Sequence, residues 1–355
     1  MRQIIYNLKK NILSISNITK PTKGDFLIQT SCSLISKGTE KLLLDFGSKN
    51  IFSKIKSQPE RVKQIRNKIK SSGLLNTYNA IQDKLEQSFS MGYCNVGKVL
   101  EIYNKNSGFK VGDRVLSNSP HAELVSNFKN TSSLIPRNVS DKDASTSILG
   151  AIALNAIRLL NPQIGNNIVV VGLGLVGNLA CQILKINGVN VIGIDTNSFK
   201  VNLSKNLNIT AIKHEKQLNY EYVFDFLDNK IIDGVIICSS SSNSSVLDLS
   251  ADIVKKKGKI ILVGVAGNNY PRNKFYEKEL NFIVSSSYGP GRYDNSYEKL
   301  GLDYPVSYVR WTEKRNIDLF LNLLSNKKIL VDDLIKKKFE FDNFQSAYDE
   351  VLNNQ

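Results

Sequence analysis

A run of apolar residues that leads directly into closely spaced glycines constrains this chain more than any other feature. In IVVVGLGLVGNLACQIL, Gly172, Gly174 and Gly177 follow a strand-like apolar run and open a helix-like pattern. In a dinucleotide-binding βαβ unit the first glycine makes the turn, the second lets the backbone approach a pyrophosphate, and the third lets helix and strand pack closely. The N–H groups at the helix start, at Leu175 and Val176, would face the phosphates. The sequence therefore predicts a dinucleotide site.

An acidic residue follows at the expected distance. A second apolar strand, VNVIGI, ends at Asp195, 23 residues after Gly172, and the acidic residue that binds the cofactor ribose lies about 20 residues on. A carboxylate there would repel a 2′-phosphate, which favours NAD over NADP; a cap of the strand-end turn is the alternative. Lys200 would lie near the adenine or its ribose, or be a surface lysine. Ser239 opens a serine-rich loop, 239–245, that would border the nicotinamide ribose.

The chain has room for two domains. Its 355 residues, at roughly 150 per domain, allow large cores. Residues 2–125 show short alternating runs and predict a β-rich domain, whereas strand and helix patterns alternate from residue 141 to about 287 and predict a doubly wound parallel sheet. The β-rich part would include strands 26–31, 97–102 and 122–125, with a turn at residues 112–113. The parallel strands would be 168–171, 191–194, 234–238, 259–263 and 282–286.

A basic segment, residues 48–90, interrupts the β-rich part. Its apolar residues recur at helical spacing, so we predict a helical insertion. Lysines and arginines concentrate in its first half. They form either a solvated face or a lid or docking surface for an anionic substrate, partner or membrane.

The formal net charge of +15 admits a nucleic-acid binder. A coding bias that favours lysine, asparagine and isoleucine explains the charge equally well, and no zinc-finger or RNA-recognition motif is present, so nucleic acid is not the expected partner. No signal peptide is expected, and the apolar stretch 168–184 is too broken and short to span a bilayer. We expect a cytoplasmic protein whose four separate cysteines are reduced.

The order of several motifs resembles the medium-chain dehydrogenase/reductase superfamily. They are SKGTE at 36–40, GYCNVGKV at 92–99, GDRV at 112–115, the glycine motif with Asp195, and KGKIILVGV at 257–265. The resemblance implies a GroES-like β-rich catalytic domain of residues 1–150, completed by 291–355, and a Rossmann NAD-binding domain of residues 151–290. It also implies hydride transfer between a carbinol or carbonyl carbon and a nicotinamide.

The zinc ligands of many such relatives have no counterpart in this sequence. Their positions correspond to Lys37, Tyr93 and Gly150 or Ala151, and the four-cysteine lobe for structural zinc is absent. Zinc requires nitrogen, sulfur or carboxylate ligands. The chain has two histidines, His121 and His214. We therefore expect no zinc.

Without a metal, a cation or a hydrogen-bond donor must polarise the substrate oxygen. The resemblance gives Thr39 the role of proton relay, and Lys37 or Tyr93 would stand near the metal position. Lys37 and Tyr93 each have a structural alternative: Lys37 would be a solvent-facing lysine, and Tyr93 would be a packed core tyrosine. Glu40 would orient Lys37 or Tyr93, or form a strand-end ion pair. His121 would serve as base, or be structural.

The stretch 289–316, GPGRYDNSYEKLGLDYPVSYVRWTEKRN, is similar to a zinc-less branch that forms the N-terminal half of bi-domain oxidoreductases linked to surface-polysaccharide and sugar metabolism. In that branch a second oxidoreductase domain follows. This sequence ends at Gln355 without such a domain, so a separate partner would supply it here. Within the stretch and just before it, Arg292 and Tyr288 would clamp a phosphate or carboxylate of the substrate, or anchor the loop or a subunit contact.

These inferences predict a zinc-independent, NAD-dependent oxidoreductase that acts on a hydroxyl or carbonyl carbon of a polar substrate such as a sugar or nucleotide sugar. A homodimer is expected from the resemblance. Two alternatives remain: a non-catalytic nucleotide-binding subunit that docks a partner through its basic insertion, and a quinone-type reductase.

Overall fold

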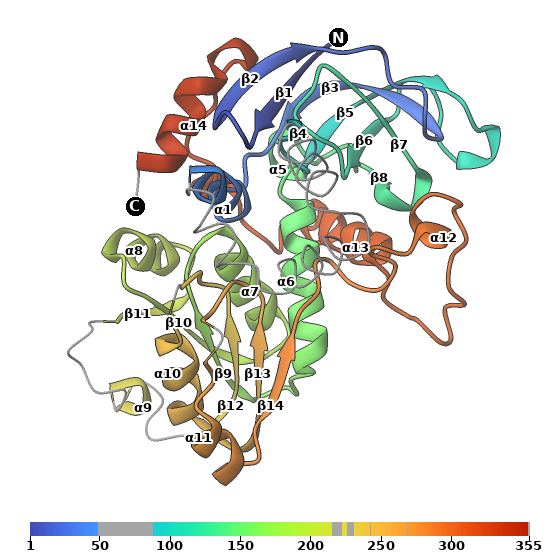
Figure 1. Cartoon of the computed structure of the whole chain (residues 1–355). Helices are drawn as coiled ribbons and strands as arrows, with labels where there is room; N and C mark the ends of the chain where they lie inside the picture. Colours follow the sequence, from blue (N-terminus) through green and yellow to red (C-terminus); the bar gives the residue numbers. More distant parts are fainter. Residues whose placement is uncertain (49–87, 215–221, 226–230, 242, 268, 354–355) are drawn as a thin grey trace, which may run out of the picture. The chain divides into compact units, whose positions relative to one another are not determined.

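The computed structural model describes residues 1–48, 88–214, 222–225, 231–241, 243–267 and 269–353 (Figure 1). The chain divides into two compact units, Met1–Asn127 with Lys337–Gln355, and Phe128–Lys336. The predicted insertion, 48–90, lies almost entirely outside the described residues. The unit boundaries differ from those that we predicted at 150/151 and 290/291, because residues 128–150 and 291–336 belong to the second compact unit. The assignment of those segments to a catalytic domain stays a prediction.

The first unit is β-rich, as predicted. Strands β2, β1 and β4 form one antiparallel sheet, and β7, β3, β5 and β6 lie side by side in another. Strand β3 is paired on both edges, with β5 and β7, and its buried residues Phe26 and Ile28 share a core cluster with Val99 and Val115. The strands are β1 (Arg2–Asn7), β2 (Ile12–Asn17), β3 (Phe26–Ser33), β4 (Ser88–Ser90), β5 (Asn95–Ile102), β6 (Arg114–Ser117) and β7 (Leu124–Asn127). Short 3₁₀ turns are η1 (Lys105–Ser107) and η4 (Phe341–Asn343).

Two helices accompany these sheets. Helix α1 (Lys37–Ser48) follows β3, and α14 (Phe344–Asn353) comes from the end of the chain. Leu44 of α1 and Tyr348 of α14 share one core cluster with Tyr6 of β1. Helix α1 corrects one of our two interpretations of Glu40, a strand-end ion pair. Glu40 lies in the first helical turn and accepts the Ser36 N–H, which stabilises the helix start much as a capping box does.

The second unit contains a parallel sheet in the order β11-β10-β9-β12-β13-β14. The five predicted strands are confirmed, and β11 (Thr210–Lys213) is an addition. From β9 the following strands, β10 and β11, are added on one side of the sheet, and from β12 the following strands, β13 and β14, are added on the other side. The direction of strand addition therefore reverses between the neighbours β9 and β12. Ligands of doubly wound sheets bind at such a switch point. The other strands are β9 (Asn167–Val171), β10 (Asn190–Asp195), β12 (Ile232–Ile237), β13 (Val254–Leu262) and β14 (Asn281–Val284).

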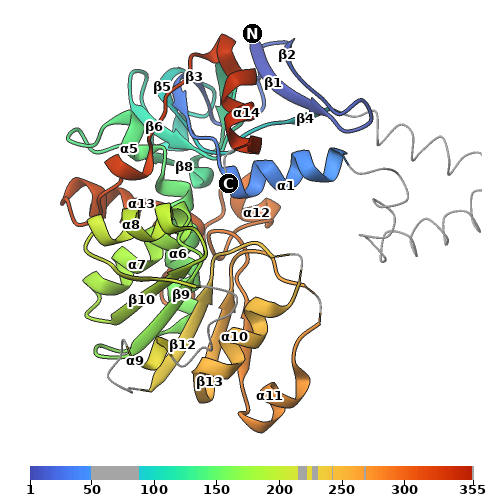
Figure 2. The ribbon, with the colours of Figure 1, turned by 90° about the vertical axis from the view of Figure 1, so that its left-hand side faces the viewer.

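Helices cover both faces of this sheet (Figure 2). Helices α6 and α7 pack against each other on one face, and α10 and α11 lie on the other. In the central strands the runs 168–171 of β9 and 235–237 of β12 are apolar and buried, since both faces of the sheet are covered. The helices are α5 (Asp141–Ala144), α6 (Ser147–Leu160), α7 (Leu175–Ile186), α8 (Ser198–Asn206), α9 (Tyr222–Asp225), α10 (Ser245–Ile253), α11 (Arg272–Glu277), α12 (Asn295–Glu298) and α13 (Glu313–Ser325).

The short elements β8 (Ser132–Leu134), η2 (Lys129–Thr131) and η3 (Asp332–Leu334) complete the second unit. Helix α13 packs on α6, and Gly150 of α6 permits this contact: a Cβ there would lie 2.2 Å from Phe320. In the described residues no helix has the length and apolar character needed to cross a membrane.

Candidate active site

The glycine loop joins β9 to α7, and each glycine has a different structural reason. Gly172 has a φ of +97°, and a Cβ on it would lie 2.5 Å from the Ser239 nitrogen. A Cβ on Gly177 would lie 1.8 Å from the Gly172 oxygen, so the helix could not pack so closely with any other residue. Gly174 differs, because a Cβ there would meet no atom within 4 Å. Its backbone is exposed, as an approaching phosphate requires.

Helix α7 begins directly after this open backbone. Gly174 is its N-cap and has no side chain to occupy the first N–H groups, which belong to the half-buried Leu175 and Val176. The N-terminus of an α-helix favours anions because these N–H groups and the helix dipole both point outward. The loop and the helix start together fit a pyrophosphate.

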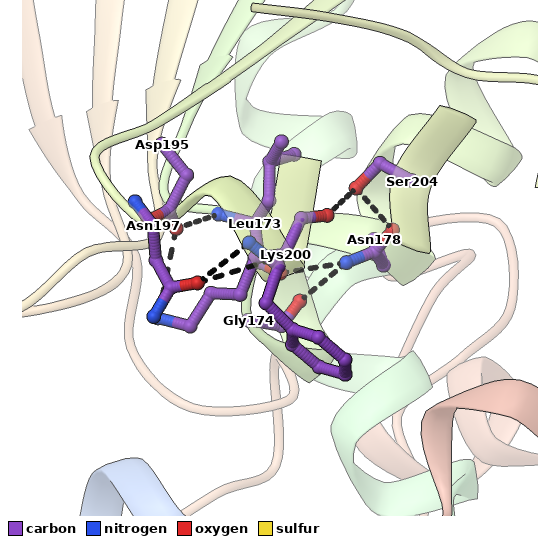
Figure 3. Close-up of polar contacts among 8 residues, drawn as sticks. Leu173, Gly174, Asn178, Asp195, Asn197, Lys200 and Ser204 are labelled. Carbon is purple, nitrogen blue, oxygen red and sulfur yellow. Dashed lines mark hydrogen bonds and ion pairs between the residues drawn. The ribbon is translucent and has the colours of Figure 1, made fainter. Parts of the chain in front are cut away.

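Asn178 fixes the loop from behind, and sequence reasoning missed it (Figure 3). Its buried amide donates to the carbonyls of Leu173 and Gly174 at 2.7 and 3.2 Å and accepts from the Ser204 hydroxyl at 2.9 Å. Asn178 and Gln182 are the polar residues that interrupt the apolar run 168–184, and this interruption was the available signal. Asn178 therefore holds the loop carbonyls inward.

Asp195 lies at the end of β10 and holds the same loop (Figure 3). Its carboxylate accepts the Leu173 N–H at 2.8 Å and the Asn197 N–H at 2.9 Å, and Lys200 Nζ lies 3.6 Å away. The Asp195 side chain is 8% exposed and that of Lys200 is 37% exposed. Asp195 thus performs the turn-capping role, and a carboxylate has further lone pairs that can accept ribose hydroxyls.

Ser239 follows β12, the strand beside β9 at the switch point. Its N–H donates to the Val171 carbonyl at 3.1 Å, directly before the glycine loop. The structure therefore brings Gly172, Asp195 and Ser239 to the carboxyl ends of three neighbouring strands, although 67 residues separate the first from the last.

A second group of polar residues lies in the first unit, around the carboxyl group of Glu40. Glu40 is 2% exposed. It accepts hydrogen bonds from the Ser36 N–H at 2.8 Å and from the Tyr348 hydroxyl, and His121 Nε2 lies 3.3 Å from it. Burial, followed by the Glu40 charge, raises the pKa of Tyr348. We call Ser36, Glu40, His121 and Tyr348 the Glu40 cluster.

His121 is packed inside this cluster rather than on a strand. Its Nδ1 lies 2.7 Å from the Ser33 hydroxyl, so the tautomer protonated at Nε2 satisfies both ring nitrogens. A Cβ on Gly92 would lie 2.4 Å from the imidazole, so the glycine makes room for the ring. His121 is 2% exposed. This environment favours the structural interpretation of His121, because a base must reach the proton that it abstracts.

Thr39 and Tyr93 form a more accessible pair. Their hydroxyls lie 3.2 Å apart; Thr39 is exposed and Tyr93 is half-buried. Burial raises the pKa of the Tyr93 phenol above its ordinary value, so the phenol keeps its proton at neutral pH. Lys37, two residues before Thr39, is exposed at the start of α1. The pair can donate a hydrogen bond to a ligand oxygen.

The residues at the family's zinc positions do not make a zinc site. Lys37 is a cation, Tyr93 retains its proton, and Gly150 has no space for a larger side chain beside Phe320. No group of three histidine, cysteine, aspartate or glutamate residues in the described ranges is arranged to hold a metal ion. Zinc bound here would lack the ligand types that it requires.

Tyr288 and Arg292, predicted to clamp substrate, lie after β14. Tyr288 is 2% exposed. The Arg292 guanidinium donates to Glu298 at 2.5 Å and lies over the Tyr293 ring, 4.1 Å from its centroid. Arg292 therefore anchors its own loop, which was our alternative interpretation.

Glu313, at the start of α13, is a buried residue that sequence reasoning missed. It is 0% exposed, and neither carboxyl oxygen has a hydrogen-bond partner within the described part of the chain; the same is true of Arg292 Nε. Burial, together with the Glu298 charge, raises the pKa of Glu313 to about 8, although Arg292 opposes the rise. An acidic residue in a first helical turn looks like an ordinary solvent-facing one, so the sequence gives no signal.

Known proteins resemble this chain in sequence and in structure. Residues 176–301 match the family described as zinc-binding dehydrogenase. The chain is 25% identical over 280 residues to D-guloside 3-dehydrogenase of Escherichia coli (strain K12), which covers 73% of each protein. It is 22% identical over 333 residues to sorbitol dehydrogenase of Halalkalibacterium halodurans, covering 82% of this chain and 89% of that one. Galactitol-1-phosphate dehydrogenase from Escherichia coli superposes with a TM-score of 0.72 at 14% identity, covering 100% and 97% of the two chains.

The solved structure of this relative covers the whole chain and agrees with its architecture. The first unit is the GroES-like β-rich part and the second contains the Rossmann sheet. The predicted family and fold class are confirmed. This chain belongs to the medium-chain dehydrogenase/reductase superfamily of oxidoreductases.

Proposed function

We propose that this oxidoreductase uses NAD(H) without zinc and oxidises a hydroxyl, or reduces a carbonyl, of a polar sugar-like substrate. The observation that carries the proposal is the glycine loop. It combines an exposed backbone at Gly174, an uncapped helix N-terminus, and Asp195 at the end of the next strand. A 2′-phosphate beside the Asp195 carboxylate would be repelled, which favours NAD over NADP.

A nicotinamide cofactor, when bound, supplies or accepts the hydride. The protein must then hold a proton at the substrate oxygen. The Thr39–Tyr93 pair suits this task, since Tyr93 keeps its proton and Thr39 is exposed beside it. In the reducing direction the Tyr93 hydroxyl would donate its proton to the carbonyl oxygen while the carbon receives the hydride. Lys37 would add positive charge near that oxygen.

The substrate class rests on relatives and on charge. The names of two curated relatives refer to a guloside and to sorbitol, and the net charge of +15 suits an anionic sugar. A separate oxidoreductase partner, a homodimer and a cytoplasmic location belong to the same proposal, as does a role in polysaccharide biosynthesis.

Replacement of Asp195 tests the cofactor assignment. Asp195→Ala should raise the Kd for NADH at least about tenfold, equivalent to about 1.4 kcal/mol, measured by the fluorescence of bound NADH. Asp195→Asn retains an oxygen for the Leu173 N–H, so it should lose discrimination against NADPH while the loop stays in place. Asp318→Asn, on an exposed side chain of α13, is the control. NADH binding that is undiminished in Asp195→Ala would refute the assignment.

Turnover separates the proposal from its alternatives. A screen of sugars, polyols and nucleotide sugars, followed at the nicotinamide absorbance band, should give NADH-dependent reduction or NAD-dependent oxidation. NADH binding without turnover on any of them would favour a non-catalytic nucleotide-binding subunit. Preference for NADPH with small conjugated carbonyls would favour a quinone-type reductase.

A further inference from the structure

A pocket lies at the amino-end edge of the Rossmann sheet, opposite the glycine loop. Its volume is about 770 Å³. Its walls include the last turn of α6, the loop that leads into β9, the end of α7, and Trp311. The dinucleotide motif lies after β9 and this pocket lies before it, so the two belong to different ends of one sheet.

Two guanidinium groups lie against the Trp311 ring. Arg158 Cζ is 3.5 Å from the ring centroid and Arg310 Cζ is 4.0 Å from it. Arg158 Nε also donates to the Asn316 side chain at 2.8 Å, which fixes the guanidinium in the pocket wall. Arginine–tryptophan stacking of this kind orients the planar cation and restricts its movement.

In the part of the chain that the structure describes, the positive charge of this pair has no carboxylate partner. Within the described residues neither arginine forms an ion pair with an aspartate or glutamate, and the hydrogen bond to Asn316 is to a neutral group. Burial, and then the charge of Arg310, lowers the pKa of Arg158 to about 10, so it remains charged at neutral pH. Arg158, whose charge is partly buried in the pocket wall, leaves a site that an anion would stabilise, and the exposed Arg310 on the same indole ring adds to the positive charge.

Two helix ends oppose this charge only in part. Helix α6 is capped by Asn161 and α7 by Asn187, and both caps line the pocket. Each helix C-terminus carries roughly −0.5 of an elementary charge, so the two ends offset about half of the two guanidinium charges. The pocket remains positive.

We propose that this pocket is a second binding site, separate from the cofactor site, for a phosphate ester of an organic molecule. Arg158, which lines the pocket, would bind the phosphate, since arginine pairs with phosphate through two parallel hydrogen bonds, and Arg310 on the same indole ring would add positive charge. The pocket volume is that of a site for a small organic ligand rather than a lone ion. Ile157, Ile164 and Ile186 would contact the organic part, and the amides of Asn161 and Gln163 would bind its hydroxyls.

Trp311 allows a direct test because it is the one tryptophan of the chain. Its fluorescence should change saturably when glucose 1-phosphate or AMP is titrated into the full-length protein, and not with glucose or adenosine. Inorganic phosphate should bind at least tenfold more weakly than the better ester. The titrations are repeated in Asp195→Ala, where binding of AMP at the cofactor site should be weaker; an affinity of the second site that is the same in both proteins separates the two sites, so the outcome does not depend on the proposed function. Whichever ester binds more tightly identifies the source as a sugar phosphate or a nucleotide.

Arg158→Gln should weaken binding of the better ester at least tenfold. The matched control is Arg272→Gln, which removes an arginine that lies over a tyrosine ring elsewhere in the second unit, and it should change nothing. NADH affinity should stay unchanged in both variants; if Arg158→Gln does not fold, the exposed Arg310→Gln takes its place. The proposal is overturned by the absence of a saturable signal, by inorganic phosphate that binds as tightly as the esters, or by equal losses in Arg158→Gln and Arg272→Gln.

Discussion

Glu40 and Glu313 are both buried glutamates, but their surroundings differ completely. Glu40, in the first unit, receives hydrogen bonds from Tyr348 and from the Ser36 N–H, and His121 lies beside it. Glu313, in the second unit, has no hydrogen-bond partner for either oxygen within the described residues. The comparison shows that burial alone does not decide how a carboxyl group behaves. The donors around it decide whether its buried position stabilises the fold.

The sequence around each glutamate does not reveal this difference. Both lie in the first turn of a helix, where acidic residues commonly interact favourably with the helix dipole. Glu40 gains one donor from Ser36, just before its own helix, and two from distant segments, at His121 and Tyr348. Glu313 lies near the loop that Arg292 and Glu298 close, and it loses contact with water without gaining a donor among the residues that the structure describes.

The largest effect is expected for Glu40→Ala. The substitution leaves Tyr348, His121 and the Ser36 N–H without their acceptor, which should cost about 4 kcal/mol and lower the Tm by roughly 10 °C. Differential scanning calorimetry measures this. Glu101→Ala, which removes an exposed ion pair with Lys20, should lower the Tm far less. Equal shifts in Tm for the two variants would show that the Glu40 cluster contributes no more to stability than an exposed ion pair does.

A pH-dependent effect is expected for Glu313→Gln. The ordinary pKa of 4.5 is raised to about 8 in the folded protein, so between these values the unfolded chain releases a proton that the folded chain retains. Stability therefore falls as the pH rises through this window. Glutamine cannot ionise, so the variant should be more stable than the native protein at pH 8, by about 4 kcal/mol, and nearly equal to it at pH 5. A variant that is less stable at pH 8 would reveal a partner for the ionised Glu313.

The smallest effect is expected for Tyr348→Phe. This change removes one donor to Glu40 and keeps the ring in the core, so it should cost about 1.5 kcal/mol. Thermal unfolding of Tyr348→Phe, Glu40→Ala and the double variant measures the coupling. The double variant should be little worse than Glu40→Ala. Additive losses would mean that Tyr348 stabilises the fold through its ring alone.

Much of the fold was predictable because its signals are local. The apolar runs before Gly172 and Asp195 predicted β9 and β10, and the turn at Gly112 predicted the start of β6. Helix α1 was missed, since its first turn contains Gly38 and its apolar face is completed by the distant Tyr348. The edge strand β11 was missed because it has only four residues.

The candidate site likewise contains residues whose proximity could be predicted from the sequence and residues whose proximity could not. Spacing alone suggested that Gly172, Asp195 and Ser239 would meet, because they follow strands of one parallel sheet. No spacing placed Tyr348 on Glu40 or Arg158 on Trp311, since each pair is separated by more than a hundred residues.

The sequence by itself determined the nucleotide-binding loop, because the requirements of that loop are requirements on backbone conformation and on neighbours within one βαβ unit. It also determined the family through the order of such local motifs. Only the tertiary structure decided which buried polar groups have partners. Hydrogen bonds and ion pairs depend on distances of a few ångströms between segments that are far apart along the chain, and those distances exist only after the chain has folded.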